Sequence, residues 1–256
     1  MSLKHLIPSA IRDQLRPAVQ RVRHYGRSTA RQVTDSAWWP KPAGWTDLRQ
    51  QLDQIDEPRA LYAIAAREFG ILQIENEIVP FLEYVRDRHP RTVGEIGLTH
   101  GGNTFLFTRL FREAERVIGV DLVLQNIGKA RFLARPGQRL DVIEGSSYAP
   151  STLKKVRRHL GSHRFDFLFI DGDHEYAGVK ADFESYFDLV RPGGLIAFHD
   201  IVPDEFARTG HRNPHSLCYG GGVHQLWGEL RDNFPHREFV DSWDQNGFGI
   251  GVLTKP

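Results

Sequence analysis

The chain has 256 residues, of which 40% are hydrophobic and 25% are charged, and its formal net charge is +1. These proportions are ordinary for a globular protein with a sizeable core, and they argue against a disordered chain. The single cysteine, Cys218, excludes a disulfide framework within the chain and any metal site built from several cysteines. No apolar run is long enough to cross a membrane and the N-terminus lacks a signal-peptide core, so we expect a cytoplasmic location.

The charge is spread unevenly along the chain. Residues 1–33 hold seven Lys or Arg against one acid, a net charge of +6, which leaves −5 for residues 34–256. Their apolar residues show a weak helical periodicity, and a basic amphipathic helix can dock on an anionic membrane surface, a nucleic acid or an acidic partner. The alternative is an arm that packs on the domain or on a second subunit, and this is the interpretation we favour.

Residues 34–45 contain prolines, a glycine and three tryptophans, and we interpret them as a packed connector. A helix is predicted over 46–70, with Thr46 as its cap and Gly70 as its stop. A second helix is predicted over 74–89, before Pro90. The expected organisation is therefore a basic arm and connector over 1–45 and a catalytic domain over 46–256, of which 46–90 is a helical lead-in.

From residue 91 onward, short apolar strands alternate with helical segments. Strands are predicted over 92–96, 117–121, 139–143, 165–171, 194–199, 236–241 and 247–253, and helices over 103–115, 124–134, 150–160, 175–190 and 222–233. Such alternation is typical of a parallel sheet covered by helices on both faces. We predict a doubly wound, mostly parallel α/β sheet of seven strands, whose last two strands form an antiparallel hairpin around 242–246.

The first strand runs into a glycine-rich turn with an acid at its end. The pattern is Glu95-x-Gly97-x-x-x-Gly101-Gly102, which differs from the G-x-G-x-x-G spacing of dinucleotide dehydrogenases. A carboxylate repels phosphate and attracts a cation. The turn therefore predicts a nucleoside ligand that carries positive charge, as the amino group of S-adenosylmethionine does.

A second acid, Asp121, ends the next strand, 26 residues after Glu95. An ionised carboxylate at that position can accept hydrogen bonds from the two hydroxyls of a ribose. The two acids in register with the glycines predict that one sulfonium nucleoside is held at both of its ends.

These features, with Asp171-Gly-Asp-His174 and His199-Asp200 after the fourth and fifth strands, resemble the class I S-adenosylmethionine-dependent methyltransferases. The closer resemblance is to the small-molecule O-methyltransferase, macrocin-type and cephalosporin-hydroxylase-like group, and it covers roughly residues 70–253. It implies methyl transfer from S-adenosylmethionine to a hydroxyl of a small molecule, such as a sugar of a glycolipid, polysaccharide or natural product.

The resemblance also implies roles for individual residues around the cofactor. It puts Glu95 and Gly97 at the methionine end, Asp121 on the ribose and Ser146 on the adenine. The remaining cofactor-contacting residues that it implies are His100, Gly101, Gly102 and Asn103 in the turn, Asp171 and Asp173 after the fourth strand, and Gln73 ahead of the sheet.

In metal-dependent relatives, the matching positions Asp171, His199 and Asp200 hold one divalent cation. Such an ion, magnesium or manganese, would lower the pKa of an acceptor hydroxyl and orient it. Relatives usually show two oxygen ligands where this chain has His199-Asp200, and magnesium seldom takes imidazole. Either the metal is not magnesium, or His199 or His174 is a catalytic general base, or neither role applies.

Residues 201–220 form a long predicted loop that we interpret as a lid with possible glycine hinges at Gly210, Gly220, Gly221 and Gly222. The expected partners are a small-molecule hydroxyl acceptor and a second copy of the chain, with no nucleic acid and at most peripheral membrane contact through 1–33. Two alternatives stay open, namely a hydroxylase-like enzyme of the same fold and a non-catalytic subunit that binds the cofactor.

Overall fold

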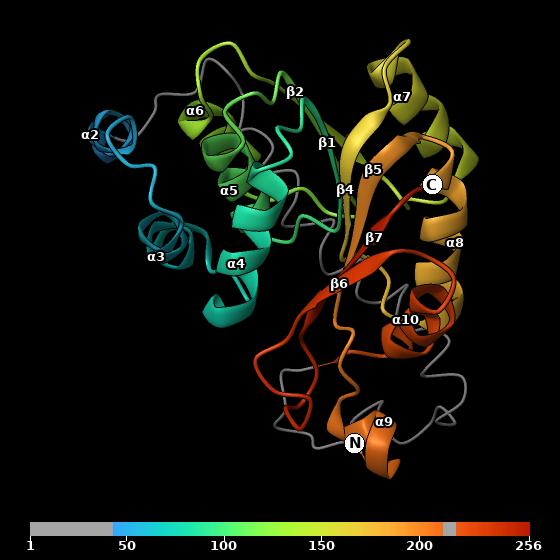
Figure 1. Cartoon of the computed structure of the whole chain (residues 1–256). Helices are drawn as coiled ribbons and strands as arrows, with labels where there is room; N and C mark the ends of the chain where they lie inside the picture. Colours follow the sequence, from blue (N-terminus) through green and yellow to red (C-terminus); the bar gives the residue numbers. More distant parts are fainter. Residues whose placement is uncertain (1–42, 212–218) are drawn as a thin grey trace, which may run out of the picture.

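The computed structural model describes residues 43–211 and 219–256. The basic arm over 1–33 and residues 34–42 of the predicted connector therefore lie outside the described residues. The remainder forms one mixed sheet with helices on both faces (Figure 1). No helix in these two ranges is long and apolar enough to cross a bilayer.

The sheet has seven strands in the order β3-β2-β1-β4-β5-β7-β6. Their bounds are β1 Thr92–Ile96, β2 Arg116–Asp121, β3 Arg139–Glu144, β4 Phe165–Ile170, β5 Val190–His199, β6 His236–Phe239 and β7 Ile250–Thr254. Strands β1 to β5 pair in parallel, whereas β7 runs antiparallel to both β5 and β6. The predicted doubly wound, mostly parallel sheet with a terminal hairpin is confirmed.

The sheet separates the core into two apolar clusters, and helices cover the cluster on each face. The bounds are α2 Ala43–Leu52, α3 Pro58–Phe69, α4 Glu75–Arg86, α5 Gly102–Leu110, α6 Ile127–Leu133, α7 Pro150–Leu160, α8 Tyr176–Phe187, α9 Glu205–Thr209 and α10 Val223–Arg231. Because successive strand residues point to opposite faces, Phe167 and Phe169 of β4 pack with α3 to α5, and Leu168 and Ile170 pack with α7, α8 and α10.

The lead-in differs from the single helix predicted over 46–70. There are two helices instead, since α2 ends at Leu52 and α3 begins at Pro58, and Thr46 lies inside α2 rather than at its start. Glu57 caps α3, since its carboxylate accepts the N–H groups of Arg59 at 3.0 Å and Ala60 at 2.6 Å. Gly70 ends α3 in the left-handed region at φ 74°, as predicted.

The hairpin connection is longer than the predicted 242–246, because β6 ends at Phe239 and β7 begins at Ile250. In this connection, acidic side chains accept hydrogen bonds from backbone N–H groups that would otherwise pair between the two strands. Glu77 of α4 accepts the N–H groups of Asp241 and Gly249, and Asp200 accepts that of Phe248. The predicted loop over 201–220 contains the short helix α9, while 212–218 lie outside the described residues.

Candidate active site

The glycine-rich turn after β1 lies directly against the end of β4. Gly97 has a φ of +84°, and a Cβ atom placed on it would lie 1.9 Å from the main-chain oxygen of Asp171. The Asp171 N–H in turn donates to the carbonyl of Ile96 at 2.8 Å. Only glycine permits this backbone conformation and this close approach, so the turn and the β4 end form one continuous surface.

Glu95 of β1 is buried, with only 1% of its surface exposed. Thr104 of α5 donates its hydroxyl to Oε2, while Oε1 is buried and accepts no hydrogen bond from any described residue. Burial raises the pKa of Glu95 to about 8. One carboxylate oxygen at the base of the turn is thus available to a donor, and a cationic donor would favour the ionised form.

Asp121 lies at the end of β2, as predicted, but its carboxylate already supports the turn. Oδ2 accepts the N–H groups of Leu98 at 2.7 Å and Thr99 at 2.9 Å, and Oδ1 accepts that of Val123 at 2.9 Å. Burial raises the pKa of Asp121 despite these bonds. A carboxylate can accept about four hydrogen bonds, so the predicted ribose contact stays a prediction alongside a holding role that the sequence did not indicate.

The other residues predicted to contact the cofactor differ in burial and in their hydrogen-bond partners. Asn103 is buried at the start of α5, and its Oδ1 has no hydrogen-bond partner within the described ranges. His100 is exposed, and Ser146 is half-buried directly after β3. Asp173 is engaged locally, since it accepts the Glu175 N–H at 3.1 Å and the Tyr148 hydroxyl at 3.2 Å. None of these contacts tests the assignment to a cofactor.

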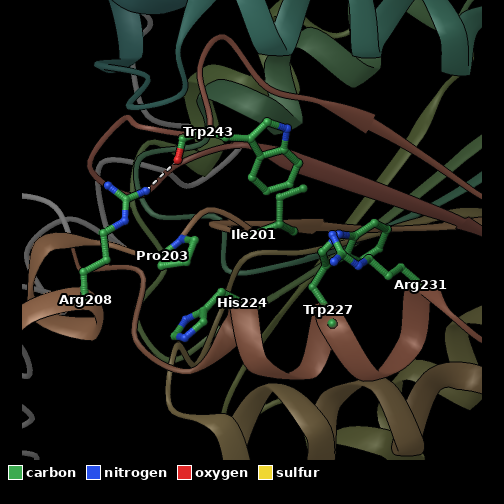
Figure 2. Close-up of a pocket in the computed structure, with 8 residues that line it drawn as sticks. Ile201, Pro203, Arg208, His224, Trp227, Arg231 and Trp243 are labelled. Atoms are coloured by element: carbon green, nitrogen blue, oxygen red, sulfur yellow. Dashed lines mark hydrogen bonds between the residues drawn. The ribbon is translucent and has the colours of Figure 1, made fainter.

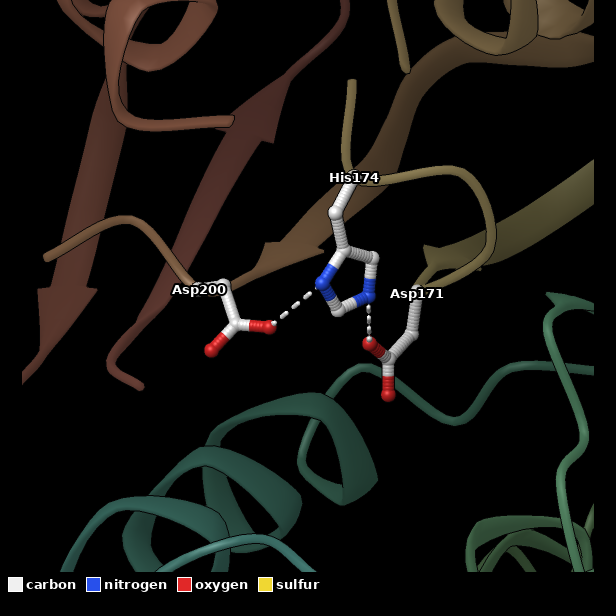
Figure 3. Close-up of side chains that lie close together, drawn as sticks. All are labelled: Asp171, His174 and Asp200. Carbon is white, nitrogen blue, oxygen red and sulfur yellow. Dashed lines mark ion pairs between the residues drawn. The ribbon is translucent and has the colours of Figure 1, made fainter. Parts of the chain in front are cut away.

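An acidic and histidine cluster occupies the carboxyl ends of β4 and β5 (Figure 3). Imidazole His174 lies between two carboxylates, with Nε2 at 3.5 Å from Asp171 Oδ1 and Nδ1 at 3.2 Å from Asp200 Oδ2. One ligand atom from each of the three residues lies within 4.8 Å of the others, a spacing suited to a single metal ion. Two carboxylates and an imidazole suit manganese, iron or zinc better than magnesium.

This grouping differs from the predicted set because His174 takes the place of His199. His199 is nevertheless adjacent, with Nδ1 at 3.3 Å from both Asp171 Oδ1 and Asp200 Oδ2. Its Nε2 is buried and makes no hydrogen bond to the part of the chain that the structure describes. His199 therefore approaches the two acids from the end of β5, whereas His174 approaches them from the loop after β4.

The two carboxylates dominate the protonation of both imidazoles. Burial alone would lower the pKa of His174, but the Asp171 hydrogen bond and charge, with Asp200, raise it to about 9. The same acids raise the pKa of His199 against the effect of burial. Burial would raise the pKa of Asp171, yet the two histidines hold it below its usual range. Without a metal, the cluster is a set of ion pairs.

Gln73 fixes the orientation of Asp171 from the opposite side of the site. It is buried between α3 and α4, and its Nε2 donates to Asp171 Oδ2 at 2.8 Å. Tyr62 holds the same segment by donating its hydroxyl to the Gln73 carbonyl at 3.0 Å. The segment between the lead-in helices thus contributes directly to the site. It uses Asp171 Oδ2, whereas both histidines lie near Asp171 Oδ1.

Two of the four glycines that were predicted as hinges, Gly221 and Gly222, pack closely beside the cluster. A Cβ atom on Gly221 would lie 2.1 Å from the His174 carbonyl oxygen, and the Gly222 N–H donates to that oxygen at 2.7 Å. Asp204 closes the base of the loop, since its Oδ2 accepts the Gly220 N–H at 3.0 Å. Close packing explains Gly221 and Gly222, whereas Gly210 ends α9 in the left-handed region with nothing within 4 Å of its Cβ position. The hinge role stays a prediction.

The same segment that carries this geometry is similar to known proteins. Residues 95–201, which span the glycine turn and both cluster-bearing strands, match a family model described as a methyltransferase domain. These residues of the chain are thus similar to a methyltransferase domain. The matched segment begins at Glu95 and ends one residue beyond Asp200. It therefore contains Glu95 and Asp121, the two acids from which a cofactor site was predicted.

Curated and solved proteins are similar to parts of this chain. Mycinamicin VI 2''-O-methyltransferase of Micromonospora griseorubida is 30% identical over 100 residues, which are 39% of this chain and 24% of that protein. The O-methyltransferase of Bacillus cereus, solved with S-adenosylhomocysteine, superposes with a TM-score of 0.54 at 18% identity, covering 89% of this chain and 98% of the other. MycE methyltransferase of mycinamycin biosynthesis, solved with Mg, S-adenosylhomocysteine and mycinamycin VI, gives 0.52 at 19% identity, covering 76% and 54%.

At identities of 18% and 19%, the structural similarities show the fold alone. The matched segments span between 8% and 45% of the three curated relatives.

Proposed function

We propose that this protein is an S-adenosylmethionine-dependent O-methyltransferase that acts on a hydroxyl of a small molecule. The observation that carries the proposal is the contact between the Gly97 turn and Asp171. This contact supports the proposal because the turn expected to hold a cationic nucleoside lies next to a cluster that could bind a metal or move a proton. Methyl transfer to a hydroxyl requires both components.

The cofactor would lie along the carboxyl edge of β1 and β2. Glu95 Oε1 would accept a hydrogen bond from the amino group of the methionine part, which explains why a buried carboxylate has an oxygen without a partner. Asp121 would accept the ribose hydroxyls and at the same time hold the turn that wraps the ligand. The sulfonium is already activated, so the main tasks of the protein are alignment and removal of one proton.

The histidine and acid cluster would handle the acceptor hydroxyl. Asp171, His174 and Asp200 fit a divalent transition metal by donor type and spacing, and such an ion would lower the pKa of the hydroxyl. His199 would then hold the two carboxylates in place through Nδ1. Without a metal, either histidine has to lose a proton before it can act as a base, because both pKa values are raised.

The proposal extends to location and partners. The enzyme would work in the cytoplasm on a small-molecule acceptor, as a homo-oligomer, with residues 1–33 available for peripheral contact with an anionic surface. The domain division at residue 45 and the assignment of His100, Ser146 and Asp173 to the cofactor belong to the same proposal.

The test is turnover measured by two products. Purified protein, S-adenosylmethionine and extracts from cells lacking the protein should yield S-adenosylhomocysteine together with an acceptor heavier by one CH₂, detected by mass spectrometry. An acceptor heavier by one oxygen, with no S-adenosylhomocysteine, would favour the hydroxylase-like alternative. Cofactor binding without either product would favour a non-catalytic subunit.

A further inference from the structure

A cavity of about 450 Å³ lies between the segment that follows β5, helices α9 and α10, and the β6–β7 connection (Figure 2). This volume is within the range of small-molecule binding sites. Its lining residues are Ile201, Pro203, Arg208, His224, Trp227, Gly228, Arg231 and Trp243. None of the roles assigned so far uses this cavity.

The cavity wall combines cations with one accessible aromatic face. Two guanidiniums, those of Arg208 and Arg231, line it, and no carboxylate is among the lining residues that the described ranges supply. Arg231 lies 3.4 Å from Glu238, which also accepts the indole N–H of Trp227 at 2.7 Å, so the pairing of Arg231 is loose. The local charge favours an anionic ligand.

Trp243 supplies the aromatic face. Its side chain is 47% exposed, whereas Trp227 is 2% exposed and belongs to the core. Arg208 donates to the main-chain oxygens of Trp243 at 2.7 Å and Asp244 at 3.1 Å, which ties one cation to the segment that carries the indole (Figure 2). Each terminal nitrogen of Arg208 still carries a second hydrogen, because a guanidinium has five donors.

The segments that line the cavity are hydrogen-bonded to residues of the acidic and histidine cluster. Ile201 directly follows Asp200, and Asp200 Oδ1 accepts the N–H of Phe248 from the same β6–β7 connection that carries Trp243. On the other side, α10 begins beside Gly222, whose N–H donates to the His174 carbonyl. A ligand in the cavity would therefore contact segments of the chain that also hold Asp200 and His174 in place.

We propose that this cavity binds the methyl acceptor itself, and that the acceptor is a cyclic molecule, a sugar or an aromatic ring, that carries a carboxylate. The carboxylate pairs with Arg208 and Arg231, and the ring lies against Trp243. This inference rests on the proposed methyltransferase function and adds the chemical class of its substrate.

The experiment is a calorimetric titration of the full-length protein with phenyl β-D-glucuronide and its uncharged counterpart, phenyl β-D-glucoside. We expect the glucuronide to bind about tenfold or more tightly than the glucoside, because only its carboxylate can accept charged hydrogen bonds from the two guanidiniums. Arg231→Gln and Trp243→Ala should each weaken glucuronide binding several-fold. Arg164→Gln, which removes an equal charge at the amino end of β4, should leave it unchanged.

Equal affinities for the two glycosides, no glucuronide binding, or equal losses in Arg231→Gln and Arg164→Gln would overturn the inference. Titration of the same samples with S-adenosylhomocysteine separates the substrate class from the proposed function. A protein that binds S-adenosylhomocysteine but not the glucuronide refutes this substrate class alone, whereas one that fails to bind S-adenosylhomocysteine refutes the proposed function.

Discussion

The main-chain oxygen of Asp171 occupies the place that a side chain on Gly97 would need, since a Cβ atom there would lie only 1.9 Å from that oxygen. This contact joins the turn that would hold the cofactor to the strand end that would hold the acceptor. The two halves of the candidate site are therefore fixed relative to each other by backbone, independently of any ligand.

Gly97→Ala should destabilise the protein severely, by at least about 2 kcal/mol, because it adds a backbone clash to an unfavourable positive φ. Gly137→Ala is the matched control, since Gly137 has a similar φ of +85° but nothing within 4 Å of its Cβ position. That change should cost only about 1 kcal/mol. Urea unfolding of both variants measures the difference, and equal losses would show that the Asp171 contact is unimportant.

Cofactor affinity should rise with pH through the titration of Glu95. The pKa of Glu95 is about 8 in the free protein, so below pH 8 the carboxyl is protonated and has to release its proton to meet a ligand ammonium. Between pH 6 and 7, S-adenosylhomocysteine affinity should increase by up to about tenfold, one pKa unit being a factor of ten. Calorimetry in buffers of different ionisation enthalpy checks both the affinity and the proton release.

Glu95→Gln is the control for this pH dependence. The variant should bind more weakly and show a flat profile from pH 6 to 8. In the wild type, the free energy of unfolding should fall as pH rises from about 4.5 to about 8, because the pKa of Glu95 is raised in the folded state. This pH dependence should be absent from the variant. An unchanged pH profile in Glu95→Gln would exclude Glu95 as the titrating group.

Asp121→Asn should destabilise the protein even without cofactor. An amide cannot accept all three backbone N–H groups that the carboxylate now accepts, and a buried unmade hydrogen bond costs about 1–3 kcal/mol. Thermal unfolding of the cofactor-free variant, with titration of S-adenosylhomocysteine alongside, measures both roles. Weakened binding with wild-type stability would assign Asp121 to the ribose alone.

Removal of divalent metal by a chelator should lower the rate of methyl transfer at least about tenfold, since an ion at this cluster would lower the pKa of the acceptor hydroxyl. Manganese should restore the rate better than magnesium, because one of the three ligands is an imidazole. His174→Ala should abolish tight manganese binding, measured by electron paramagnetic resonance, and exposed Asp188→Asn should not. A rate indifferent to chelation would leave the cluster to a metal-free histidine base.

Glu77→Gln should loosen the connection that carries Trp243. Buried Glu77 accepts the Gly249 N–H at 2.9 Å and the Asp241 N–H at 3.1 Å, and an amide would present N–H hydrogens to one of these donors. We expect a loss of about 1–3 kcal/mol in unfolding free energy and faster hydrogen exchange over 241–249. Exposed Glu83→Gln on the same helix should change neither.

The sequence predicted the sheet because its apolar strands and glycine turns are local signals. Glu95, Gly97 and Asp121 lie at the expected strand ends for that reason. The break at Glu57-Pro58 was also present locally, as a capping acid before a proline, although the helical periodicity on both sides obscured it.

What the sequence could not provide are contacts between distant segments. The bond from Gly249 to Glu77 joins residues 172 positions apart, and the bond from Gln73 to Asp171 joins residues 98 positions apart. The choice between His174 and His199 depended on side-chain placement at the ends of two strands. The lining of the cavity likewise depends on packing between α9, α10 and the hairpin connection, which no local pattern encodes.

The most direct test of the central claim is a calorimetric titration of the wild-type protein with S-adenosylhomocysteine and, separately, with NAD⁺. The account predicts binding of one S-adenosylhomocysteine per chain, weakened by Glu95→Gln, and no detectable binding of NAD⁺. Binding of NAD⁺ in preference to S-adenosylhomocysteine, or no binding of either compound, would contradict it.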